Sequence, residues 1–94
     1  MSQAVENRSR VVLEPLAEPA AGPDPGWMRC RVVVSQAADV EGYPNLLAGD
    51  LPREMEALIP TDEAAALTAG VGPHERLASL VGPRTLRVFP QEPG

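Results

Sequence analysis

Residues 54–70, EMEALIPTDEAAALTAG, contain the change of pattern that decides the fold. Apolar and polar side chains alternate at the start of this stretch, as in a half-buried strand, and Pro60 ends the alternation. Thr61 is a suitable N-cap residue, since its hydroxyl can accept from free amides of a first helical turn. Gly70 suits the left-handed position that follows a last helical turn. The stretch therefore predicts a strand that leads directly into a short Ala-rich helix.

The predicted helix has an ordinary explanation for its acidic start. Asp62 and Glu63 fit the positive end of the helix dipole. Neighbouring residues of a helix do not face each other, which argues against a catalytic or cation-binding pair. A helix of about nine residues is too short to be stable alone. We therefore expect it to dock over one end of a barrel, through Ala64, Leu67 and Val71.

Strand-like patterns surround this junction. They occupy residues 10–13, 27–37, 53–59, 75–81 and 85–89. The expected inward faces of the second, third and fifth segments are Cys30, Val32 and Val34; Met55, Ala57 and Ile59; and Leu86 and Val88. The pattern of residues 75–81 leaves the inward face undecided. Residues 27–37 form a run long enough to require curvature in a small barrel, which favours a β-bulge within it.

The order of these elements predicts a mainly β fold. We expect a small five-stranded OB-like barrel with one short helix between the third and fourth strands. The same order is compatible with small barrels appended to transport ATPases and with some SH3-like barrels, so it identifies no family. We expect a disordered tail at residues 1–9, a single barrel domain at residues 10–90 and a C-terminal tail at residues 91–94.

Composition restricts the possible partners. The net charge is −5, and all eight basic residues are arginines spread along the chain. Nucleic acid is therefore an unlikely ligand, because phosphate binding needs clustered cations. The absence of lysine suggests GC-rich, bacterial coding. No apolar run approaches the roughly 18 residues of a membrane span, and the polar start has no signal-peptide core, so we expect a cytoplasmic protein without membrane contact.

The sequence contains no pattern that predicts catalysis or cofactor binding. Cys30 is the only cysteine and lies in a strand-like run, so we expect a buried, unreactive thiol. His74 is the only histidine, and its position after Gly72 and Pro73 predicts a solvated turn residue. No glycine-rich phosphate loop or pairing of nucleophile and base is recognisable. We therefore expect no catalytic residue, no metal and no cofactor, and a protein that is not an enzyme.

Two groups of residues are candidates for binding. The connection at residues 39–52 is rich in Gly and Pro yet carries several apolar side chains, so it either caps the barrel or contacts a partner. Within it, Tyr43, Leu46 and Leu47 are the candidate partner-binding residues. The second group is a possible ligand face of outward arginines on two strands, consisting of Arg29, Arg31 and Arg87.

These features lead to three hypotheses about function. The first is a non-catalytic protein-binding module, or a small accessory subunit of a larger bacterial assembly, whose partner is another protein or a second copy of the chain. The second is an OB-like barrel that binds single-stranded nucleic acid or a small ligand through its arginines. The third is an acidic inhibitor or immunity-type protein whose negative surface blocks a basic site on its target.

Overall fold

The computed structural model describes residues 6–22, 24–69 and 73–90. The strands are β1 (Ser9–Pro15), β2 (Ala20–Ala21), β3 (Trp27–Asp39), β4 (Arg53–Pro60), β5 (His74–Gly82) and β6 (Thr85–Val88), and the helix is α1 (Thr61–Ala69). Among the described residues, no helix has the length and hydrophobicity needed to cross a membrane. The tail expected at residues 91–94, and the expected contact of Val71, lie outside these ranges.

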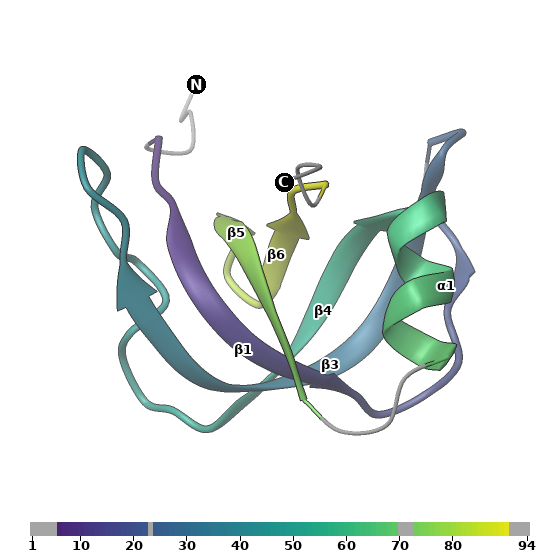
Figure 1. Cartoon of the computed structure of the whole chain (residues 1–94), viewed down its shortest axis with the longest axis horizontal. Helices are drawn as coiled ribbons and strands as arrows, with labels where there is room; N and C mark the ends of the chain where they lie inside the picture. The colour runs from purple at the N-terminus through teal and green to yellow at the C-terminus, as the bar shows by residue number, and fades with distance from the viewer. Residues whose placement is uncertain (1–5, 23, 70–72, 91–94) are drawn as a thin grey trace.

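The main strands form a closed barrel, as predicted (Figure 1). Around the circle, β1 pairs with β5, β5 with β6, β6 with β4, β4 with β3, and β3 again with β1. All of these pairs are antiparallel except β4 with β6. Strand β2, whose two residues pair with β3, was not predicted from the sequence. When β2 is included in the strand count, α1 follows the fourth strand, whereas we expected it after the third.

The predicted bulge lies in β3, at Ser35. Val12 of β1 is opposite Gln36, but the next residue, Leu13, is opposite Val34, so Ser35 is an extra residue on β3. A bulge of this kind bends its strand and increases the local twist. The bend lets the first part of β3 pair with β4 and the last part pair with β1, which closes the barrel.

The inward faces predicted for β3, β4 and β6 are all buried, and the core contains no buried aromatic side chain among the described residues. Each fully buried aliphatic side chain stabilises the fold by about 1.5–3 kcal/mol. In β5, Ala78 is fully buried and Leu80 packs against the core. Val81 is an extra residue between two register pairs of β5 and β6, and its side chain is exposed.

The connection between β3 and β4 caps the barrel through Asn45. The Ser9 hydroxyl donates a hydrogen bond to Asn45 Oδ1 at 2.6 Å, and the Leu47 N–H donates to the same oxygen at 3.1 Å. Asn45 Nδ2 donates in turn to Ala37 O at 3.0 Å. One side chain thus ties the connection to both β1 and β3, with Leu47 inserted into the core.

Ordered packing begins before Arg10, within the tail that we expected at residues 1–9. Asn7 is buried, and its side-chain amide donates to Leu80 O at 3.0 Å and accepts from Leu80 N–H at 2.7 Å. Ser9 is also buried and begins β1. The polar character of this segment concealed the packing, because a polar side chain can be buried when its hydrogen bonds are satisfied.

The helix closes the other end of the barrel, where it packs against β1, β3 and β4 (Figure 1). Ala64 and Leu67 are buried, as predicted. Pro60 ends the strand as predicted: it is the last residue of β4 and lies opposite Trp27. Thr61 is the first helical residue, and its N–H donates to Gly26 O at 2.9 Å.

An ion pair with little solvent exposure joins the helix to β5. Arg76 Nε lies 3.2 Å from Glu63 Oε1, and the two side chains are 11% and 16% exposed. Removing one partner of such a pair leaves the other charge in a poorly solvated place, which costs more than losing an exposed pair.

We predict that Arg76→Gln lowers the free energy of unfolding by about 3 kcal/mol. The matched control is Arg10→Gln. It breaks the pair with Glu75 at 3.6 Å, in which both side chains are at least half exposed, and should cost less than about 1 kcal/mol. Urea denaturation of both variants measures the difference. Equal losses would show that the Arg76–Glu63 pair has no special part in holding the helix.

Candidate functional site: a groove over the outer face of β3, β4 and β6

Four open hollows on the described surface adjoin one another through shared lining residues, and we call the four together the β4 groove. The first and second hollows share Glu56 and Thr85. The second and third share Leu58, and the third and fourth share Val81 and Arg87. The groove therefore extends across the outward side chains of β4 and β6 to the bulge of β5.

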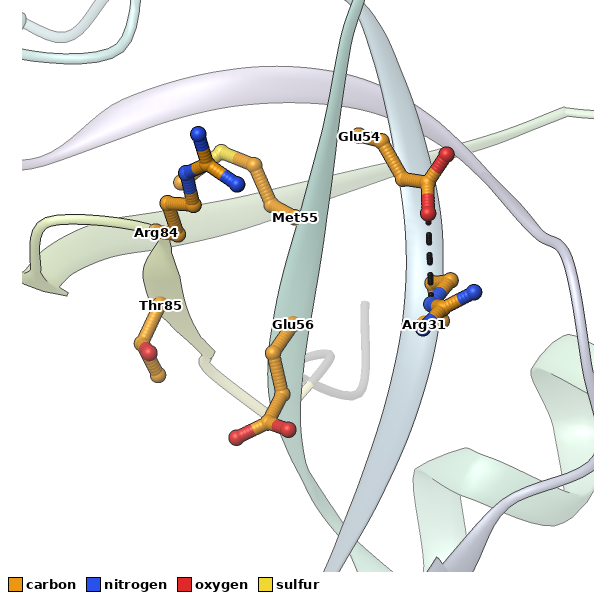
Figure 2. A pocket seen from close by; sticks show the side chains of 6 residues that line it. All are labelled: Arg31, Glu54, Met55, Glu56, Arg84 and Thr85. Carbon is orange, nitrogen blue, oxygen red and sulfur yellow. Dashed lines mark ion pairs between the residues drawn. The ribbon is translucent and has the colours of Figure 1, made fainter.

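The first end of the groove is a hollow of about 520 Å³ between charged side chains (Figure 2). On one side of β4, Arg31 Nε lies 3.2 Å from Glu54 Oε1. Arg84 and Thr85 line the other side. The turn that carries Arg84 is fixed to β4, because the Glu56 N–H donates to Arg84 O at 2.9 Å.

The middle of the groove places an apolar side chain between two arginines. Arg29, Leu58 and Arg87 are register partners across β3, β4 and β6, so their side chains share the outer face. Trp27 lines the adjoining hollow with Leu58. Gly22 forms part of the wall, and a Cβ there would lie 2.6 Å from Trp27 O, so only glycine allows this close approach of the β2 hairpin.

The far end of the groove contains a stack of arginines and aromatic rings. The guanidinium carbon of Arg8 lies 4.3 Å from the centroid of the Phe89 ring and 4.6 Å from that of Tyr43. The guanidinium carbon of Arg87 lies 5.1 Å from the same Phe89 centroid. Arg8, Arg87 and Phe89 line this hollow of about 380 Å³. Cation–π contacts hold each of these side chains in place.

The groove has mixed charge. Four of its arginines have no ion pair with a described residue: Arg8, Arg29, Arg84 and Arg87. Four carboxylates line it as well: Glu6, Asp24, Glu54 and Glu56. A polyanion would meet these carboxylates along the whole path, whereas a ligand that carries both signs could match them.

The structure places all three residues of the predicted ligand face in this groove. Arg31 lines its first hollow, Arg29 its second, and Arg87 its last two. Neither the contribution of Leu58 nor the stack at Arg8 was predicted from the sequence. Leu58 is an apolar residue on the same outward face as the glutamates of β4, and this position was a signal that it could contact a ligand. The stack at Arg8 had no sequence signal, because its members come from distant parts of the chain.

The three candidate partner-binding residues do not share one surface. Leu46 is 42% exposed, whereas Leu47 is 2% exposed and belongs to the core. Tyr43 is half-buried and stacks on Arg8. Leu47 therefore serves as part of the cap and cannot contact a partner without unfolding the connection.

We predict opposite results for two neighbouring leucine substitutions. Leu47→Ala should lower the free energy of unfolding by about 2–5 kcal/mol, because it leaves a cavity in the core. Leu46→Ala should change it by less than about 0.5 kcal/mol, as is usual at the surface. Thermal or urea denaturation measures both. A small effect of Leu47→Ala would mean that the connection does not cap the barrel in solution.

Cys30 and His74 lie away from the groove. Cys30 is buried, as predicted, and its thiol donates to Ala17 O at 3.2 Å. Burial raises the pKa of this thiol. His74 is not the solvated turn residue that we expected; it begins β5, and its Nε2 is buried without a hydrogen-bond partner in the described structure. No three His, Cys, Asp or Glu side chains of the described residues cluster as metal ligands would.

The raised pKa of Cys30 predicts a slow and pH-dependent thiol. The thiolate is the reactive form, so a disulfide reagent at pH 8 should modify the native protein more slowly than the urea-unfolded protein. The pKa of the Cys30 thiol is higher in the folded than in the unfolded chain. The buried, protonated thiol therefore contributes its full stabilisation of the fold at neutral pH. This contribution is lost as pH rises above about 8.5, where the thiol of the unfolded chain begins to ionise. Cys30→Ala should remove that loss. Equal labelling rates would show an accessible thiol.

No protein-family model matches this chain, and neither a curated protein nor a solved structure matches it.

Proposed function

We propose that this chain is a non-catalytic module that binds a segment of another protein in the β4 groove. The observation that carries the proposal is the mixture of arginine, carboxylate and apolar side chains along a row of adjoining hollows. Arginine and tryptophan are enriched where proteins bind each other. Arg29, Trp27 and Arg87 surround Leu58 here, which supplies a small apolar centre with a charged rim.

A protein segment fits this groove better than nucleic acid does. Binding of single strands relies on free aromatic faces and a basic path. Phe89 and Tyr43 are already stacked against arginines, and carboxylates line the path that a phosphate backbone would take. The OB-like barrel nevertheless uses the corresponding face and loops for ligands in other proteins, which supports the choice of this face as the binding surface.

The chain would act as a small accessory subunit of a larger bacterial assembly in the cytoplasm, with another protein as its partner. The arginine-only basic composition favours a bacterial origin, and the small aliphatic core suits a domain that gains stability from a partner.

A peptide library displayed against the full chain tests this function. Selected peptides should change the fluorescence of Trp27, which is the only tryptophan and lines the groove. Leu58→Asp should weaken their binding by at least about tenfold, as expected for a central contact. Circular dichroism of the variant verifies that the fold is retained.

The matched control is Leu46→Asp, the same change on the exposed connection between β3 and β4. It should leave peptide binding unchanged. If Leu46→Asp abolishes binding and Leu58→Asp does not, the connection is the contact surface and the groove is not. If an oligothymidine binds, with affinity that falls steeply with salt, while no peptide is selected, the module binds nucleic acid instead.

A further inference from the structure

The far end of the β4 groove holds two arginines against one aromatic ring. Arg8 comes from the segment before β1, and Arg87 comes from β6, yet both guanidinium groups lie within 5.1 Å of the Phe89 centroid. Both arginines line the same hollow of about 380 Å³. Neither has an ion pair with any residue in the described ranges. Two positive charges thus face one space without a counter-charge bound to them.

The position of Arg8 restricts how a ligand could use it. The Tyr43 and Phe89 rings lie against its guanidinium, and Nε is buried without a hydrogen-bond partner. The Nη groups of Arg8 are therefore the donors left for a ligand in the hollow that Arg8 lines. Arginine binds carboxylates edge-on, through parallel N–H···O bonds in the plane of the guanidinium. The rings hold that plane fixed, so less conformational freedom is lost when a ligand binds.

We propose that this hollow binds a carboxylate at the end of the bound protein segment, either its terminal carboxylate or an acidic side chain. The inference rests on the proposed function, because this hollow adjoins the middle of the β4 groove, with Val81 and Arg87 lining both. A segment whose apolar side chain packs on Leu58 and Val81 would bring its carboxylate to Arg8 and Arg87.

The surroundings of the hollow favour a single carboxylate over a more highly charged anion. Glu6 also lines the hollow, and it would repel a phosphate dianion more strongly than a monoanion. The bound carboxylate would compete with Glu6 for the two arginines. Glu6→Gln should therefore tighten carboxylate binding.

Nuclear magnetic resonance of arginine Nε–H groups gives a direct test on the full chain. The probes are N-acetyl-leucine, its C-terminal amide and inorganic phosphate. N-acetyl-leucine should shift the Arg8 and Arg87 signals, and the uncharged amide should not. Arg87→Gln should weaken the binding of N-acetyl-leucine by about tenfold, as for loss of a charge-assisted hydrogen bond. Arg10→Gln, which removes an arginine of β1 that pairs with Glu75 outside this hollow, should leave it unchanged.

Equal shifts with the acid and the amide, or no shift with either, would overturn the inference. Binding of phosphate at least as tight as that of N-acetyl-leucine would overturn the choice of a carboxylate. Some selected peptides will lack acidic side chains. If these bind the groove equally well with a C-terminal carboxylate and with a C-terminal amide, this inference is overturned and the proposed function stays intact. The two proposals can also fail separately in the other direction. If N-acetyl-leucine binds in this hollow but Leu58→Asp leaves peptide binding intact, the inference is supported and the proposed function is overturned.

Discussion

The pairing of β3 with two barrel neighbours is the constraint on which the rest of the structure depends. One strand of 13 residues pairs with β4 over its first part and with β1 over its last part. The bulge at Ser35 provides the bend between the two pairings. Closure fixes the outward register of Arg29 and Arg31 against β4, and it also creates the two open ends that α1 and the connection at Asn45 cover.

The sequence was sufficient to predict the fold class because its signals are local. Alternation identified the inward faces of β3, β4 and β6, and the proline, threonine and glycine around residues 60–70 identified the helix. β2 escaped prediction because two alanines in a proline-rich loop carry no alternation, and their pairing with β3 depends on the tight approach of Gly22 to Trp27. Asn7 and Ser9 escaped because their burial depends on hydrogen bonds to distant residues.

The candidate site was predictable only in part, for a related reason. Outward arginines can be recognised from alternation along single strands. Their assembly into one groove depends on the register between strands, which places Leu58 between Arg29 and Arg87. In the connection between β3 and β4, no periodicity distinguishes the buried Leu47 from the exposed Leu46. For this loop the sequence left both capping and partner contact open, because sequence shows how much apolar character a loop has but not which side chains point inward.

Site-specific photo-crosslinking in the native host tests the central claim, that the β4 groove is the surface where a protein partner binds. A photoreactive amino acid would replace Thr85, which lines the groove, and in a separate variant Gln36, which is exposed on β3 and lines none of its hollows. The account predicts that position 85 crosslinks to a defined protein and that position 36 does not. Crosslinks of equal yield from both positions, or a crosslink from position 36 alone, would contradict it.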